Sequence, residues 1–121
     1  MSVYGKWVAA TIAATASESS AIDLGREYDF LSLQIPEMDN CILYLKVAEI
    51  EGGTYYDLVS EEARLTIFNE ANELEEGEVE EIESKGNRAD VWRLGGWRFI
   101  KVVSSVAQSA ERLIRVCGMR Y

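Results

Sequence analysis

Short runs of strand-forming residues, separated by Gly, Asp, Asn, Ser or Pro, recur along this chain and constrain its fold more than any other feature. One run covers residues 28–35, where apolar side chains alternate with polar ones until Pro36, the only proline, ends the strand. Another covers residues 97–104, where Trp97 and Phe99 occupy alternate positions after a glycine pair. Short strands with turn residues between them are typical of an all-β sandwich or barrel.

The same pattern places strands along most of the chain. We expect them at residues 6–15, 21–25, 28–35, 41–49, 55–58, 89–94, 97–104 and 112–119. Residues 6–15 are rich in alanine, so a helix is the alternative there. The whole pattern predicts a single domain over residues 1–121, a jelly-roll-like β-sandwich of about eight strands. Within it, residues 1–7 are a candidate N-terminal arm and residues 70–90 an acidic loop or edge region.

Residues 60–76 fit two interpretations. As a helix, they would begin at an N-cap Ser60 and end at Gly77, with apolar side chains along one stripe. As a strand, they would use the β-type run at residues 64–69 and continue as an acidic loop. The β-type run favours the strand, and both alternatives stay open here.

The side chains that most catalytic and metal sites need are missing or unarranged. The chain has no histidine, which excludes a Ser-His-Asp or Cys-His arrangement. It also has no P-loop, no G-x-G-x-x-G motif, no EF-hand spacing and no C-x-x-C pair. We therefore expect no enzyme activity, no cofactor and no metal site.

The cysteines and the apolar runs indicate a cellular compartment. Cys41 and Cys117 lie inside apolar strand-like runs, which favours two buried, reduced thiols. A disulfide between neighbouring strands is the alternative. No run is apolar enough to span a membrane or to form a convincing signal peptide. Synthesis in a cytoplasm, without a membrane partner, is the expectation.

Charge is unevenly distributed along the chain, whose formal net charge is −9. Residues 58–84 carry ten acidic side chains and one basic, whereas residues 85–121 carry two acidic and eight basic. A chain this acidic lacks the basic field that nucleic-acid binding needs, so nucleic acid is not an expected partner. The segregation predicts that the acidic middle faces something basic: the C-terminal third of the chain, the same third of a neighbouring subunit, or another protein.

Two charged groups are candidates for that contact. The acidic run, which includes Glu75, Glu78 and Glu80, is either a solvated loop or edge that discourages aggregation, or an electrostatic docking surface. Calcium binding is a third interpretation, although the run lacks coordinating spacing. The basic candidates alternate with apolar residues on strands that could pair: Arg93, Arg98, Lys101, Arg112 and Arg115. They form either an outward polar face or the surface that meets the acidic run of an adjacent subunit.

Four segments carry a resemblance to a known group of proteins. They are SSAIDLG at residues 19–25, FLSLQIP at residues 30–36, GTYYDL at residues 53–58 and GGWRFIKVVSS at residues 95–105. In this order they resemble small structural proteins of tailed bacteriophages, often encoded near head genes. The acidic stretch at residues 70–83 departs from that group, whose members tend to be rich in Gly, Thr and Ala there.

The resemblance implies a non-enzymatic virion protein, made in the host cytoplasm, that decorates or cements the capsid. Its partner would be the major capsid protein or another virion protein. By analogy it would bind as a homo-oligomer, with a trimer the natural guess for a capsid threefold site. Val3, Tyr4 and Trp7 in the N-terminal segment would form an anchoring arm.

Aromatic side chains support an alternative from a different class. Trp92, Trp97 and Phe99 lie in expected strands, where alternate aromatic positions are usually core, but exposed rings would make a sugar-stacking platform. Tyr55 and Tyr56 lie at an expected hairpin, so at least one ring should be exposed. With Trp92, these tyrosines would serve a carbohydrate-binding jelly-roll module, free-standing or part of a tail fibre.

Overall fold

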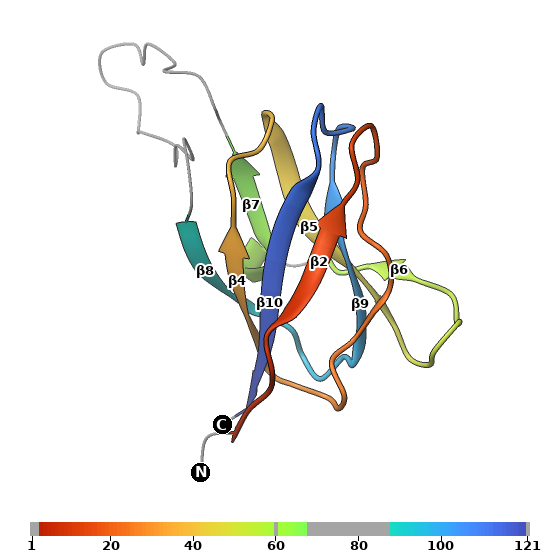
Figure 1. The fold of residues 1–121 in the computed structure, drawn as a ribbon. Helices are drawn as coiled ribbons and strands as arrows, with labels where there is room; N and C mark the ends of the chain where they lie inside the picture. Colours follow the sequence, from red (N-terminus) through yellow and green to blue (C-terminus); the bar gives the residue numbers. More distant parts are fainter. Residues whose placement is uncertain (1–2, 60, 68–87, 121) are drawn as a thin grey trace.

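The computed structural model describes residues 3–59, 61–67 and 88–120, which fold as a sandwich of two antiparallel sheets (Figure 1). Within these residues each sheet has five strands. Sheet A contains β1 (Val3–Tyr4), β2 (Val8–Ile12), β4 (Phe30–Ile35), β8 (Arg88–Arg93) and β10 (Arg112–Arg120). Sheet B contains β3 (Ile22–Asp23), β5 (Cys41–Ala48), β6 (Tyr56–Asp57), β7 (Arg64–Ile67) and β9 (Phe99–Ser104). The expected all-β sandwich is confirmed.

The order of the strands shows how the chain is wound. Sheet A has the order β2–β10–β4–β8, with β1 beside β10 on the same edge as β2, and sheet B has the order β3–β9–β5–β7, with β6 also beside β5. The antiparallel pairs are nested: β2 with β10, β3 with β9, β4 with β8, and β5 with β7. Eight strands nested in this way over two sheets are the jelly-roll arrangement that the sequence predicts. In Figure 1 the strands of sheet A form the near layer, and β5, β7 and β9 lie behind them.

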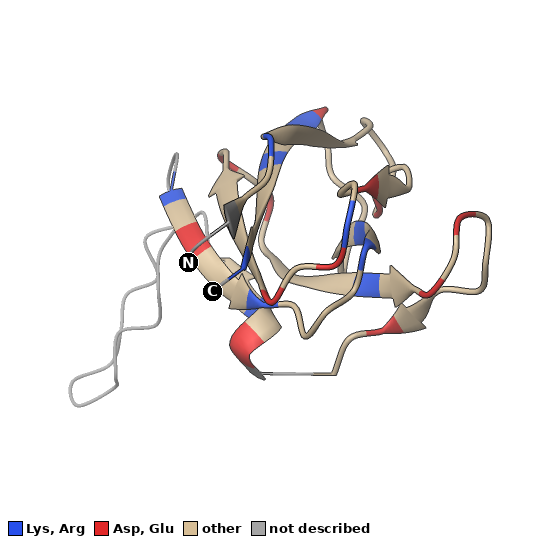
Figure 2. Cartoon of the chain, turned by 90° about the horizontal axis from the view of Figure 1, so that it is seen from below, with Lys and Arg blue, Asp and Glu red and all other residues tan. Residues whose placement is uncertain are grey.

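Alternation along each strand sends one set of side chains into the core. On β4, Leu31, Leu33 and Ile35 are buried, as their spacing predicts, whereas Gln34 between them is exposed. The facing strands complete the core with apolar side chains: Leu43, Leu45, Val47, Ile100, Val102, Ile114 and Val116. Viewed along the strands, the two sheets curve around this common interior (Figure 2). Burial of this apolar surface is the main favourable contribution to folding.

The end of sheet A near β1 is closed by Tyr28, which is buried against β10. A Cβ atom at Gly118 would overlap the Tyr28 ring, and a Cβ atom at Gly5 would lie 2.7 Å from the Tyr28 hydroxyl oxygen. Glycine at these two positions therefore leaves room for the ring. The Gly5 N–H donates a hydrogen bond to the Gly118 carbonyl (2.9 Å), which holds β1 beside β10.

Two ambiguous segments contain strands. Residues 6–15 hold β2, so the helix alternative there is wrong, and the chain turns at Thr15, whose φ is +68°. In residues 60–76, a single 3-10 turn (Glu61–Ala63) leads into β7, so the strand interpretation is confirmed as far as Ile67. The acidic candidates Glu75, Glu78 and Glu80 lie outside the described residues. None of the described residues forms a helix long and apolar enough to cross a membrane.

Candidate interaction surface

The outer face of sheet A carries few charged side chains. Outward positions align in rows across the strands, and the central row consists of Ala9, Arg115, Gln34 and Ala89. The flanking rows hold the other outward positions: Thr11 and Leu113; Cys117, Ser32 and Val91; Met119, Phe30 and Arg93. In these rows the charged side chains are Arg115 and Arg93, and the uncharged polar ones are Thr11, Gln34 and Ser32. The other positions are apolar, and of these Cys117 and Met119 are buried.

Large apolar side chains on this face are open to solvent. Val91 is 53% exposed and Leu113 is 55% exposed. Trp7, in the segment between β1 and β2, is 41% exposed and lines a hollow on the same face with Val91. Apolar side chains gathered on one exposed face are typical of an interaction surface.

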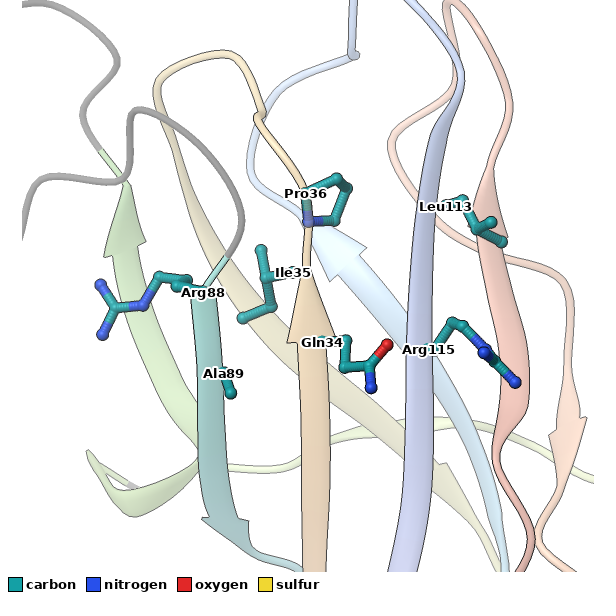
Figure 3. Close-up of a pocket in the computed structure, with 7 residues that line it drawn as sticks. All are labelled: Gln34, Ile35, Pro36, Arg88, Ala89, Leu113 and Arg115. Carbon is teal, nitrogen blue, oxygen red and sulfur yellow. The ribbon is translucent and has the colours of Figure 1, made fainter.

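Open hollows cross this face between β8 and the β1–β2 edge. One of about 560 Å³ is lined by Pro36, Leu113 and Arg115 together with residues of β4 and β8 (Figure 3). A second of about 480 Å³ lies between Trp7 and Val91. Protruding side chains of a complementary protein surface could fill these hollows.

Arg115 is the cation at the centre of this face. No carboxylate of the described residues forms a salt bridge with it. Arg93, at the edge of the face, lies 3.6 Å from the Glu62 carboxylate, and both side chains are largely exposed. A cation that has no carboxylate partner among the described residues is available to pair with a carboxylate of another protein.

The outer face of sheet B is charged, and two of its lysines share one carboxylate of the chain. Lys46 and Lys101 lie side by side on β5 and β9, and both bind the carboxylate of Glu18, at 3.1 and 3.4 Å. The Lys101 ammonium also lies 4.7 Å from the centre of the Tyr55 ring. The hydrogen bond from Lys46 is the main cause that lowers the pKa of Glu18, and Lys101 adds to it. In this cluster one carboxylate is the partner of two ammonium groups.

Two further ion pairs hold loops at the ends of the sandwich. Arg98 makes two hydrogen bonds to the Asp23 carboxylate, at 2.7 and 3.1 Å, and these lower the pKa of Asp23. Arg112 donates to Asp39 at 3.1 Å, and the Ser109 N–H donates to the same carboxylate at 2.6 Å. The Ser109 N–H is the main cause that lowers the pKa of Asp39.

These contacts correct the expectation of one basic face. β9 and β10 belong to different sheets and do not pair, because the jelly roll puts successive strands of this region into opposite layers. In the described part of the chain, the basic candidates with a carboxylate partner are Arg93, Arg98, Lys101 and Arg112. Each of these carboxylates lies outside the acidic run at residues 70–83. Of the five candidates, Arg115 is the one for which the described residues provide no carboxylate partner.

The N-terminal candidates lie beside sheet A. Val3 and Tyr4 pair with Arg120 and Met119 as β1, so this segment is a short strand of the sheet. The side chains of Tyr4 and Trp7 are exposed. Their use as an anchor stays a prediction, and the geometry places that anchor next to the apolar face.

The aromatic candidates divide between core and surface. Trp92 is 1% exposed, and its indole N–H donates to Asp90 at 3.0 Å, so a role in sugar stacking is wrong for this ring. Phe99 is also buried, and Trp97 packs against the core. Tyr55 is half-buried beneath Lys101, and burial raises its pKa, whereas Tyr56 is exposed.

Both cysteines are buried and free, which confirms the interpretation that their apolar sequence surroundings favoured. Burial raises the pKa of the Cys41 thiol and of the Cys117 thiol. The disulfide alternative is wrong, because Cys41 lies on β5 of sheet B and Cys117 on β10 of sheet A. Across the residues that the structure describes, no cluster of three or more Cys, Asp or Glu side chains could hold a metal ion.

Comparison of the chain with protein-family models, with curated proteins and with solved structures gave no match. Sequence reasoning missed Val91, Leu113 and their neighbours as surface candidates. Side chains at residues 88–93 alternate between the two faces of a strand. The sequence alone does not say which face is inward, and the burial of Trp92 decides it.

Proposed function

We propose that this protein is a virion structural protein of a tailed bacteriophage, which binds the head surface as a decoration or cementing protein. Four strand and turn segments that resemble small structural proteins of tailed bacteriophages support this, as does the jelly-roll architecture. The observation that carries the proposal is the outer face of sheet A, which is hollowed and exposes large apolar side chains to solvent. Its partner would be the major capsid protein or another virion protein.

Docking through this face would be driven by burial of apolar surface. Each Å² of apolar area removed from water contributes about 25 cal/mol, and a specific interface buries about 800 Å² on each partner. Trp7, Val91 and Leu113 would be the apolar anchors, since exposed side chains of this size lose the most water contact on binding. Arg115 would pair with a carboxylate of the capsid shell. This ion pair would set the orientation of the docked protein more than it would raise the binding affinity.

The carbohydrate-binding alternative has no observation of its own in its favour. Trp92 is buried and Tyr55 lies beneath Lys101, so Tyr56 is the exposed ring of the three. A glycan array separates the two functions. A cementing protein should give no specific signal on it, whereas saturable binding that Tyr56→Ala removes would replace our proposal.

The first test is whether the chain is part of a particle. Phage particles purified by density gradient from a lysate of the source culture are analysed by mass spectrometry. We expect the chain at a fixed ratio to the major capsid protein. Recovery of the chain in the soluble fraction, with none on particles, would overturn the proposal.

A matched pair of variants tests the face. Val91→Glu places a carboxylate among the apolar side chains of sheet A, and Val59→Glu makes the same change at an exposed valine in the loop that follows β6. Burying an unpaired charge is costly, so Val91→Glu should lower occupancy on particles stripped of the protein by about tenfold or more. Val59→Glu should leave occupancy unchanged. Equal occupancy for both variants would exclude the outer face of sheet A as the docking surface.

A further inference from the structure

The open edges of the two sheets differ in how they are protected against pairing with another strand. In the described part of the chain, sheet A ends at β2 and β8, and sheet B ends at β3 and at β7 with β6. β8 carries Arg88, Asp90 and Arg93, and the Asp90 carboxylate accepts a hydrogen bond from the Val91 N–H (2.9 Å). β3 and β6 are two residues long, and β7 carries Arg64. Charges and short strands are known devices for blocking edges.

β2 has none of these devices. Its sequence is Val-Ala-Ala-Thr-Ile, with no charge, proline or glycine, and residues 7–17 contain no charged side chain. Strands are usually about five residues long, so β2 is long enough to pair on both sides. An uncharged edge strand of this length is a template for a further strand.

The register shows which backbone groups of β2 face outward. The Gly5 N–H donates to the Gly118 carbonyl, so Gly118 and every second residue of β10 direct their backbone groups toward β1 and β2. Their partners on β2 are Val8, Ala10 and Ile12, which bond to β10. The N–H and C=O groups of Ala9 and Thr11 therefore point away from the sheet. No described residue forms a hydrogen bond with these four groups.

We propose that β2 pairs antiparallel with β2 of a second copy of this chain, around a twofold axis at Ala10. Ala9 then lies opposite Thr11 of the second copy, and this pair and its symmetry mate form four backbone hydrogen bonds. Val8 lies opposite Ile12 of the second copy. The strand suits this self-pairing because the small Ala10 lies at the axis and the β-branched Val8 and Ile12 lie at the ends.

Charge at the two ends of the edge agrees with an antiparallel pair. Lys6 precedes β2 and Glu111 precedes Arg112, which pairs with Ile12 at the other end. Both side chains are exposed. Antiparallel pairing brings Lys6 of each copy to the end at which Glu111 of the other copy lies. Unlike charges thus meet at both ends, in a chain whose net charge would otherwise keep copies apart.

The pair would join the two copies of sheet A into one continuous sheet. Because the twofold axis is perpendicular to that sheet, the apolar outer faces of both copies would point to the same side. This inference concerns copies of the chain alone, and it stands whether or not the partner of the outer face is a capsid.

Two measurements on the unmodified chain test the pairing. Light scattering after size exclusion should give twice the chain mass of 13.6 kDa. Amide hydrogen exchange should be slow at Ala9 and Thr11 and should become faster on dilution, since free edge amides exchange rapidly. A chain-sized mass at every concentration, a trimer mass, or fast exchange at both amides in a dimer would overturn the proposal.

A matched pair of proline variants tests whether the contact between the two copies lies at the β2 edge. Ala9 and Ala89 lie in the same row of sheet A at opposite edges, and each directs its N–H away from the sheet. Proline is tolerated at such edge positions but removes the outward donor and blocks pairing there. Ala9→Pro should halve the measured mass, and Ala89→Pro should leave the dimer intact. Equal behaviour of the two variants would contradict the proposal.

The outcome is separable from that of the proposed function. Val91→Glu should leave the dimer intact while it lowers particle occupancy, because Val91 lies on β8, far along the sheet from β2. If Ala9→Pro does not fold, as its circular dichroism would reveal, hydrogen exchange of the unmodified chain still decides the question.

Discussion

The outer faces of sheets A and B use charge in opposite ways. On sheet B, one carboxylate, Glu18, binds Lys46 and Lys101, and a tyrosine ring lies against the second lysine. On sheet A, Arg115 has no such partner among the described residues, and the side chains around it are mainly apolar. The two faces cover the same core, so stability of the core does not require this difference. The two lysines of sheet B already share a carboxylate of the chain, whereas Arg115 on sheet A is available to the carboxylate of a partner.

The largest expected change in the free energy of unfolding comes from comparing a buried and an exposed side chain of β8. Trp92→Ala removes a buried ring and should lower the free energy of unfolding by about 3–5 kcal/mol. Val91→Ala, at the next position along β8, should change it by less than about 1 kcal/mol, because Val91 is exposed. Urea denaturation of both variants measures the difference. Similar losses would mean that Val91 is covered in solution.

The next largest change in stability tests the close contact between Gly118 and the Tyr28 ring at the end of sheet A. Gly118→Ala brings a methyl group into the Tyr28 ring and should lower the free energy of unfolding by about 1–3 kcal/mol. In a Tyr28→Ala background the ring is absent, so the same glycine substitution should cost little. Additive losses in the double variant would show that the ring does not cause the effect.

Acid should destabilise the folded state by protonating carboxylates that form ion pairs. The described residues place no such carboxylate at the centre of the sheet A face. Partners lower the pKa of Glu18, Asp23 and Asp39 below their ordinary values of 4.5, 3.8 and 3.8. The stability they contribute is fully present above those values and is lost as pH falls through the lower, folded-state values. The melting temperature should therefore decline below about pH 4.5. A curve that stays flat there, measured by circular dichroism, would contradict these pairings.

The smallest effects come from single charges on the two faces. Glu18→Gln removes the shared partner of two lysines and should lower the free energy of unfolding by up to about 1 kcal/mol, less at high salt. Arg115→Gln removes a charge that has no carboxylate partner among the described residues, and it should leave stability nearly unchanged. Urea denaturation at low and high salt compares them. A larger loss for Arg115→Gln would reveal a partner for Arg115 within the chain.

Local features of the fold were predictable from the sequence, and the pairing of strands was less so. The spacing of Leu31, Leu33 and Ile35 indicates one buried face, and Pro36 marks the end of that strand, because both depend on neighbouring residues alone. The neighbours of Lys101 and Arg112 depend on which sheet each strand joins. Short strands with similar composition do not encode that choice locally.

The surface was harder to predict than the core for the same reason. Val91 and Trp92 are adjacent and both apolar, and period-two alternation alone does not say which one faces inward. The Asp90 carboxylate accepts from the Trp92 indole and from the Val91 backbone, a pair of contacts that exists only after the strand is placed. Exposed apolar residues of one face come from distant segments, so their grouping follows from the fold.

The position of β10 has a consequence for biosynthesis. This strand lies between β4 and the β1–β2 edge, so it joins strands that the ribosome produces much earlier. While β10 is still in the exit tunnel, β2 and β4 have emerged without the strand that separates them. The described strands of sheet B, by contrast, have all been synthesised once β9 has emerged. A message truncated before residue 112 would therefore yield a chain with one potential layer and exposed apolar strands, a species prone to aggregate.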